Sequence, residues 1–575
     1  MDVRLEAIKF NHDPDSATRD AFNIRRNETE FVERPEWRRG VSIRPVDSPT
    51  AYAIRETRGK TITIKAQFSS TEAAGKTLQV RAVEARAQRR QAFGLGLFDF
   101  LLRAILSDRL APFGNVLGQV KEREIDFNSE GKTGFEEFEL QNVRLWSRGV
   151  SVSTTEWRWQ FRANSGDQWT DFALTRHRVY VVLEIPKCPW QQEPFAETNT
   201  QLPWAEALEV ACDWAASATD VDEAATLVTR AVNDLGLHGV TYDGLSSYSC
   251  PNFNCTQFLD LVRGGLGMGK IVNCSDCASA VSSFANLVGC DLRQLELGPD
   301  AFHTNQIKLI GATQASPLFE FFGHEVAWYG NVTDQGRVFD ACLQLDGDDR
   351  PEATPFVALL PKNIPFGSAH EKNYRFRLSA TLVFLKPDTL GCRKIGYSVF
   401  GDCKPPDDAR LEFLKIRHDY ASWKDLAPGK QGSLGYDQFL KHELLSQWVL
   451  RLPVQRPKFV GAVNAVQSLW CSVADKEAIL RLDVVEWKTW QEAREFMLRE
   501  LGEFRLPQIE RLTYPTIGDV SFASDGSVLF ARAQFVFLVR SVGRTLIPLR
   551  QTALELATLY GTGPGNFYDG NDFES

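Results

Sequence analysis

Cys274 is the residue of this chain whose surroundings best fit a chemical role. It lies in the segment GKIVNCSDCASAVSSFANLVGCDL, where a short apolar stretch, Ile271 and Val272, precedes a helical pattern. Asn273 is a good helix N-cap and Asp276 completes a variant of the capping box, so Cys274 is expected at the first helical position. There the helix dipole and the unpaired amide donors favour the thiolate, which makes Cys274 a candidate nucleophile.

A nucleophilic cysteine needs a base, and the base needs a partner that orients it. The segments FEFFGHEVAWYG and GRVFDACLQLD read as two strands joined by a turn over Gly330 to Gly336. We expect Tyr329 to pair with Arg337. In that register His324 and Asp340 lie on one face as diagonal neighbours, with Cβ atoms roughly 7 to 8 Å apart. A shift by one residue would separate them, so the prediction depends on the register.

This order and spacing resemble the transglutaminase-like branch of the papain-like cysteine enzymes. In that family a catalytic cysteine begins a helix as Cys-x-Asp-x-Ala, and a glycine closes the helix about fifteen residues later. The matching residues here are Cys274, Asp276, Ala278 and Gly289. The family's histidine begins a strand and its aspartate follows about sixteen residues later, as His324 and Asp340 do. The resemblance covers about residues 203–349.

The resemblance implies that Cys274 is the nucleophile, His324 the general base and acid, and Asp340 the group that orients His324. It implies attack on an amide or isopeptide carbonyl of a protein or peptide and a thioester intermediate, which water or an amine resolves. Because water reaches an acyl-enzyme by default, we expect a peptidase, isopeptidase or amidase, with transamidation as the alternative. The chain departs from the family pattern in a second thiol, Cys277, and in HEVAW where the family often has His-Ala-Trp.

Other interpretations of these segments stay open. Two cysteine pairs could form a four-thiolate zinc site in an interaction module. The pairs are Cys250 with Cys255 and Cys274 with Cys277. A transglutaminase-like fold could also serve as an inactive binding scaffold, since a fold does not guarantee a function.

Two further motifs receive structural interpretations. The segment GGLGMGK at 264–270 fits Gly-x-x-x-x-Gly-Lys, but Ile271 follows where a phosphate loop needs Ser or Thr, so it is predicted to be a flexible connection. The acids Asp346, Asp348 and Asp349 are expected in a solvated turn, not as a second acid or a calcium loop.

The elements that would position the site form the middle of a multi-domain α+β chain. Residues 1–190 are predicted to be a β-sandwich, interrupted by a helix at 93–106, because alternating and β-branched segments dominate. The strand-like segments are 61–68, 78–83, 157–161 and 178–185. The proline-containing stretch 186–203 marks a domain boundary.

Helices dominate from Pro203 onward, and residues 203–350 are predicted to be the transglutaminase-like catalytic domain. The expected helices are 204–218, 222–236 with Gly236 as its stop, and 256–263. Residues 351–460 form a mixed connecting region with strand-like text at 374–385.

A small α+β domain is predicted over 475–562, and residues 563–575 are predicted to be a disordered tail. A helix is expected from Thr489 to Leu501, with a capping box of Thr489 and Glu492 and with Gly502 as its stop.

Composition limits the classes of function. The chain has 575 residues, 43% hydrophobic and 24% charged, and at roughly 150 residues per domain this predicts about three to four domains. The formal net charge of −9 argues against a nucleic acid as main partner, because no basic face displaces phosphate counterions. Protein partners are expected for the flanking domains, and neither a cofactor nor a metal ion is predicted.

The expected location is the cytoplasm. The start MDVRLEAIKFNHD lacks the apolar region of a secretory signal. The apolar run 93–106 is shorter than the roughly 20 residues of a membrane span and contains Asp99 and Arg103, so no membrane span is predicted. Eleven cysteines without a small disulfide framework fit a reducing compartment.

Overall fold

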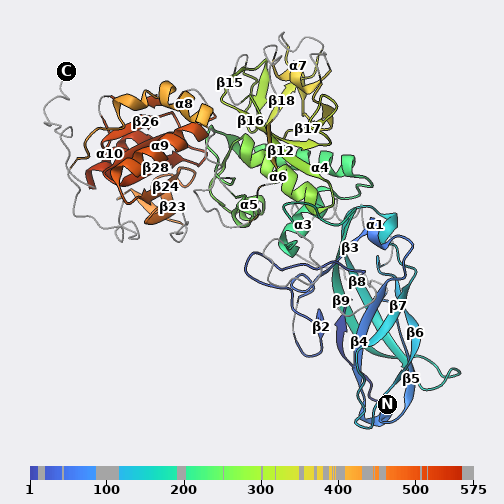
Figure 1. Ribbon diagram of the computed structural model, residues 1–575. Coiled ribbons are helices and arrows are strands. Elements are labelled where there is room, and N and C mark those ends of the chain that lie inside the picture. The colour runs from blue at the N-terminus through green and yellow to red at the C-terminus, as the bar shows by residue number, and fades with distance from the viewer. Residues whose placement is uncertain are drawn as a thin grey trace. The chain divides into compact units, whose positions relative to one another are not determined.

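The protein combines several β-sheets with helices into a mixed α/β architecture, as a computed structural model shows (Figure 1). Two compact units are distinguished, Met1–Leu227 with Phe284–Cys290, and Val228–Ser283 with Asp291–Ser575. The described residues are 1–10, 20–41, 44–85, 115–190, 202–249, 252–298, 302–316, 319–348, 355–367, 372–379, 388–391, 393, 395, 408–429, 445, 447–451, 461–505, 508–513 and 516–559. The predicted helix at 93–106 and tail at 563–575 therefore lie outside them.

The first unit is built on a nine-stranded sheet in the order β2-β1-β4-β7-β6-β5-β8-β9-β3. Its strands are β1 (Arg4–Lys9), β2 (Trp37–Arg38), β3 (Thr50–Ala53), β4 (Thr63–Ser69), β5 (Thr77–Glu84), β6 (Gln119–Asp126), β7 (Glu136–Gln141), β8 (Ser151–Arg162) and β9 (Thr170–Val182), with the short helix α1 (Ile54–Thr57) after β3. All four predicted strands are confirmed. They formed because alternate residues, such as Trp157 and Trp159 on β8, point into one core.

The predicted helices around the site are also present. They are α3 (Ala205–Trp214), α4 (Val221–Asp234), α5 (Cys255–Val262) and α6 (Cys274–Leu287). The prediction that Gly236 stops its helix is wrong. After α4 the chain continues as a 3-10 turn over Leu235–His238, and Gly239 ends it with a φ of +88°, a left-handed conformation that glycine adopts without strain.

The site lies on a five-stranded sheet of the second unit, in the order β20-β17-β16-β12-β21. Its strands are β12 (Leu292–Leu297), β16 (His324–Tyr329), β17 (Arg337–Phe339), β20 (Ile364–Pro365) and β21 (Asp388–Gly391). The predicted hairpin register is confirmed, because Tyr329 pairs with Arg337 and Trp328 with Val338. Strand β17 ends at Phe339, so Asp340 follows the strand directly.

Smaller sheets complete this region. β10 (Thr241–Tyr242) pairs in parallel with β11 (Ile271–Val272), β13 (Phe302–His303) pairs with β15 (Glu320–Phe321), and β14 (Ile307–Leu309), β18 (Leu343–Asp346) and β19 (Ala358–Leu359) form a three-stranded sheet. The strand-like stretch expected at 374–385 is wrong in its first part, because Tyr374–Leu378 forms the helix α7; residues 380–385 lie outside the described residues. Tyr374 and Leu378 are four residues apart and both lie in the core. Residues with this spacing share one face of a strand and also one face of a helix, so the spacing does not distinguish the two.

A seven-stranded sheet occupies the C-terminal part of the second unit, in the order β22-β23-β24-β28-β27-β26-β25. Its strands are β22 (Trp448–Leu450), β23 (Asn464–Ser472), β24 (Ile479–Glu486), β25 (Glu510–Arg511), β26 (Val520–Ala523), β27 (Ser527–Arg532) and β28 (Phe535–Ser541), and its helices are α8 (Asp408–Arg417), α9 (Trp490–Glu503) and α10 (Leu549–Leu559). Helices cover both faces, because neighbouring strand residues pack on opposite sides. Val485 joins the core of α9, whereas Val484 joins the core of α10.

The start of α9 is as predicted and its end is not. Thr489 and Glu492 form the expected capping box. The helix continues through Gly502 to Glu503, so Gly502 is not its stop. A Cβ at Gly502 would lie 2.6 Å from a methyl carbon of Leu414 on α8, so close helix packing explains this glycine.

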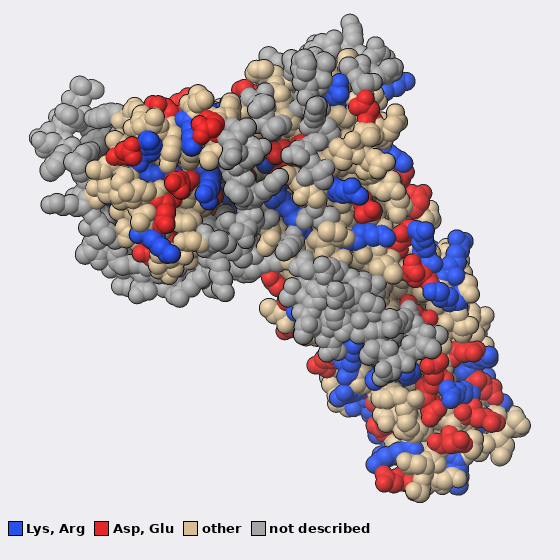
Figure 2. All heavy atoms as spheres, in the orientation of Figure 1, with Lys and Arg blue, Asp and Glu red and all other residues tan. Residues whose placement is uncertain are grey.

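Two surface properties bear on the expected partners. No helix among the described residues is long and apolar enough to cross a lipid bilayer. Basic and acidic side chains lie interspersed on the face seen in Figure 2.

Candidate active site

The helix α6 begins at Cys274, and its start is fixed by the predicted capping box. Asn273 Oδ1 accepts a hydrogen bond from the Asp276 amide at 3.1 Å, and the Asn273 amide donates to Asp276 Oδ2 at 3.1 Å. Strand β11 immediately precedes this cap and is held by β10. Cys274 therefore occupies a defined position at the positive end of a helix, where a thiolate is favoured.

Asp276 also anchors a loop that lies 28 to 30 residues earlier in the chain. Its carboxylate accepts hydrogen bonds from the Ser246 hydroxyl at 2.6 Å, the Ser247 amide at 2.8 Å and the Tyr248 amide at 2.8 Å. Burial raises the pKa of Asp276, and these hydrogen bonds act in the opposite direction. The aspartate of the Cys-x-Asp pattern thus binds the loop to the helix start and lies among backbone donors.

His324 and Asp340 meet as the hairpin register predicts. His324 Nε2 lies 2.8 Å from Asp340 Oδ2, and both side chains are buried. The same Oδ2 accepts a hydrogen bond from the Tyr374 hydroxyl at 2.8 Å, while Oδ1 accepts from the Cys342 amide at 2.9 Å. Asp340 is held by three donors and is directed at the histidine, which suits an orienting carboxylate.

The pKa of His324 reflects both Asp340 and Cys274. Burial alone lowers the pKa of His324 and is the largest single effect, but the Asp340 carboxylate and the Cys274 sulfur together raise it to about 10. Nδ1, the ring nitrogen not used by Asp340, is buried and makes no hydrogen bond of normal geometry with the described residues. This environment favours the protonated imidazolium of His324.

Tyr242 is a site residue that the sequence did not reveal. Strand β10 pairs Tyr242 with Val272, two residues before Cys274. The ring packs edge-on against Phe321, which in turn lies 4.7 Å from the His324 ring. Burial and then the Cys274 charge raise the pKa of Tyr242, and its buried hydroxyl has no hydrogen-bond partner among the described residues. A neutral phenol donor therefore lies close to the candidate nucleophile.

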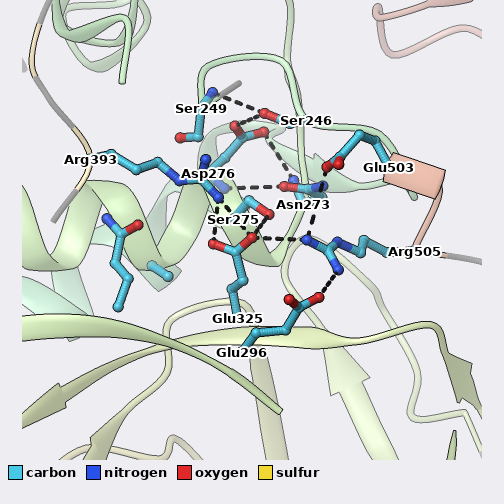
Figure 3. A network of polar contacts seen from close by, with 12 residues as sticks. Ser246, Ser249, Asn273, Ser275, Asp276, Glu296, Glu325, Arg393, Glu503 and Arg505 are labelled. Atoms are coloured by element: carbon cyan, nitrogen blue, oxygen red, sulfur yellow. Dashed lines mark hydrogen bonds and ion pairs between the residues drawn. The ribbon is translucent and has the colours of Figure 1, made fainter. Parts of the chain in front are cut away.

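Glu325, the residue after His324, lies in a buried polar network. Its carboxylate accepts from Ser275 Oγ at 2.6 Å, from Arg393 Nη2 at 2.7 and 2.8 Å, and from Arg505 Nη2 at 2.9 Å (Figure 3). Burial is the largest effect and raises the pKa of Glu325, but Arg393 and Arg505 outweigh it, so the pKa is lowered. The ionised carboxylate of Glu325, which follows His324, thus binds Ser275, which follows Cys274.

The zinc alternative finds no support among the described cysteines. Cys277 lies buried on α6, close enough to Cys342 for the two thiols to shift each other's pKa. No group of three or more His, Cys, Asp or Glu in the described ranges is arranged to hold a metal ion. Cys250 lies outside those ranges.

The structure describes part of two other segments with predicted roles, and Asp346 differs from its prediction. Asp346 is buried and accepts hydrogen bonds from the amides of Asp348 and Val357, so it does not belong to a solvated turn. In the GGLGMGK segment the Gly267 amide donates to Asp260 and the Met268 amide to the Tyr248 hydroxyl. These amides are held by the protein's own oxygens, as in a tightly bonded turn.

Comparisons with known proteins add little to this geometry. No family model and no curated protein matches the chain. Among solved structures, the chain is similar to the crystal structure of red sea bream transglutaminase, with a TM-score of 0.26 and 9% sequence identity, over 84% of this chain and 74% of that chain. A likeness at this TM-score supports no argument about fold or function.

Proposed function

We propose that the chain is a cysteine-dependent acyl-transfer enzyme that acts on an amide of a protein or peptide. The supporting observation is the 2.8 Å contact between His324 and Asp340 beside a cysteine at the first residue of α6. In this proposal residues 203–350 are a transglutaminase-like catalytic domain whose sheet also takes β20 and β21 from the following segment, and residues 1–190 are a β-sandwich. The α+β domain predicted over 475–562 also includes α8, β22 and β23. The flanking regions are proposed to contact protein partners.

The first chemical step is attack of the Cys274 thiolate on the carbonyl carbon. A C–S bond forms, the carbonyl electrons move to oxygen, and the C–N bond then breaks as the His324 imidazolium gives its proton to the leaving amine. The tetrahedral oxyanion needs donors in a dry site. We assign one donor role to the Tyr242 hydroxyl, which is buried near Cys274 and has no hydrogen-bond partner among the described residues.

The second step resolves the thioester. Neutral His324 accepts a proton from the incoming water or amine while that nucleophile attacks the thioester carbon, and the C–S bond breaks to return the thiolate. Asp340 keeps Nε2 engaged throughout, so that Nδ1 is the nitrogen that exchanges protons. We propose hydrolysis as the main outcome and amine transfer as the alternative.

A second candidate function is an inactive binding scaffold. The observation that favours it is the complete burial of Cys274 and His324, each 0% exposed. A substrate carbonyl cannot reach a fully covered sulfur without displacement of the side chains around it. Reactivity of Cys274 in the native protein separates the two candidates.

The test is competitive alkylation of the native chain. Limiting iodoacetamide is applied between pH 5.5 and 9.5, and mass spectrometry identifies which cysteine reacts first. We expect Cys274 to react at low pH and to lose this reactivity in His324→Ala, because the imidazolium supports the thiolate. Cys277→Ser is the matched control on the same helix and should leave the profile unchanged.

Acyl transfer is tested with p-nitrophenyl acetate, an activated ester that reports a nucleophilic thiolate. The proposal expects a burst of p-nitrophenol, a thioester on Cys274 detected after acid quench, and faster turnover when an amine such as hydroxylamine is added. A Cys274 that resists both reagents in the folded chain would refute the enzyme and support the scaffold.

A further inference from the structure

Arg505 connects the C-terminal sheet with the candidate active site inside the second unit. It follows α9 and carries its guanidinium to two strands of the site sheet. Nη1 donates to Glu296 on β12 and to the Phe322 carbonyl at 3.3 Å, and Nη2 donates to Glu325 on β16 at 2.9 Å. Figure 3 shows Arg505 directed at these two carboxylates.

The backbone of Arg505 is held on both sides as well. Its amide donates to the Gly244 carbonyl at 3.0 Å, and its carbonyl accepts from the Phe322 amide at 3.1 Å. Gly323 makes room for the guanidinium, since a Cβ there would lie 2.7 Å from Arg505 Nη1. Arg505 therefore lies between the segment that contains Tyr242 and the segment that contains His324, and its backbone binds both.

Two arginines on strands of the C-terminal sheet reach the loop that Asp276 anchors. Arg481 on β24 donates to the Ser247 carbonyl at 3.2 Å. Arg540 on β28 donates to the Ser246 carbonyl at 2.8 Å and to the Leu245 carbonyl at 3.0 Å. The sheet thus binds the carbonyls of a loop whose amides bind the start of α6.

The three arginines have acceptors in the site region that replace water. An arginine withdrawn from water loses its hydration, which carboxylate and carbonyl oxygens must replace. Arg505, Arg481 and Arg540 are all buried, and each reaches the site region through charge-assisted hydrogen bonds.

We propose that the C-terminal sheet is an integral part of the catalytic unit and that Arg505 is a positioning residue. Through Glu325 it fixes Ser275, the neighbour of Cys274, and the strand that presents His324. Its catalytic consequence rests on the function proposed above, whereas its effect on the start of α6 does not.

The test compares three variants of the full-length chain. Arg505→Gln removes the charge, and Arg505→Lys keeps it. Arg494→Gln is the matched control, because Arg494 is a buried arginine on α9 whose ion pair with Asp519 stays within the C-terminal part. Two properties are measured, the amide hydrogen exchange of residues 274–283 and the pH profile of Cys274 alkylation.

We expect Arg505→Gln to accelerate amide exchange at the start of α6 by at least about tenfold. We also expect it to slow Cys274 alkylation about tenfold at pH 6.5, with a change within about twofold at pH 9.5, because a positive charge that supports the thiolate is gone. Arg505→Lys should recover most of the alkylation rate at pH 6.5, and Arg494→Gln should leave both properties near those of the unmodified chain.

The proposal is overturned if Arg505→Gln leaves the exchange of α6 unchanged, or if Arg494→Gln produces the same changes and so reveals general loosening. If Cys274 of the unmodified chain is unreactive, the proposed enzymatic function fails. The exchange comparison then still decides whether Arg505 positions the helix.

Discussion

Replacing Asp340 by asparagine tests whether the Asp340 carboxylate sets the protonation of His324. Asp340 uses Oδ2 for His324 and Tyr374 and Oδ1 for the Cys342 amide. An asparagine that keeps its oxygen on the Cys342 amide turns its NH2 group toward His324 Nε2. This makes Nε2 an acceptor, places the ring proton on Nδ1 and removes the base from the nitrogen that faces the thiol.

The opposite amide orientation is no better. It keeps an acceptor for His324 but sets the NH2 group against the Cys342 amide, which leaves two buried donors facing each other at a cost of about 1 to 3 kcal/mol. In neither orientation does a carboxylate stabilise the imidazolium. We therefore expect Asp340→Asn to lose the ion pair and to keep the fold.

The magnitude follows from the thiolate fraction. A thiol without an imidazolium partner ionises near pH 8.5, so about 0.3% of it is thiolate at pH 6. Alkylation of Cys274 at pH 6 should thus fall by roughly 300-fold in Asp340→Asn and recover to within about threefold at pH 9.5. Tyr374→Phe keeps the carboxylate and should slow alkylation at pH 6 by less than about tenfold. The reasoning is refuted if Asp340→Asn alkylates at pH 6 within threefold of the unmodified chain.

Three further outcomes are expected. Tyr242→Phe should lower acyl transfer from p-nitrophenyl acetate by about 10²-fold while alkylation of Cys274 stays within about twofold, because only the oxyanion loses a donor; a parallel loss of both would contradict this role. The pKa of His324 is raised to about 10, so its contribution to stability is complete below about pH 6.5 and is lost as the pH rises through about 10. Urea unfolding followed by hydrogen exchange on β16 should accordingly show a loss on the order of a few kcal/mol between pH 6 and 10, and a smaller loss in His324→Gln. Trp159→Ala should destabilise the nine-stranded sheet by about 3 to 5 kcal/mol, measured as a shift of the denaturant midpoint of β8, since Trp159 is fully buried in that core.

Local features of the site could be predicted because nearby residues determine them. The reciprocal bonds of Asn273 and Asp276 join residues three apart, and the turn after Tyr329 sets the pairing of β16 with β17. From these two elements the positions of Cys274, His324 and Asp340 follow. The strands of the first unit were predictable for the same reason, since their alternation reflects burial on one side.

The rest depends on contacts that a one-dimensional pattern does not contain. Tyr374 begins a stretch whose residue types predict a strand, and nothing local directs its hydroxyl at Asp340. Gly236 and Gly502 resembled helix stops, yet Gly502 makes room for Leu414 of another helix. Glu325 is 180 residues from Arg505, so its partner became evident only in three dimensions.

The distances along the chain have a consequence for how this protein comes to be made. The bond between Arg540 and Ser246 spans 294 residues, and most of the C-terminal sheet is synthesised long after Cys274 has left the ribosome. Long-range contacts form late, because the entropy of closing large loops must be overcome first. During that interval Leu245, Ser246 and Ser247 lack their arginine donors, and the loop that Asp276 binds is held only from the side of α6. A chain that ends before Arg481 and Arg540 therefore contains Cys274 without the arginine contacts that hold the loop bound to the start of α6.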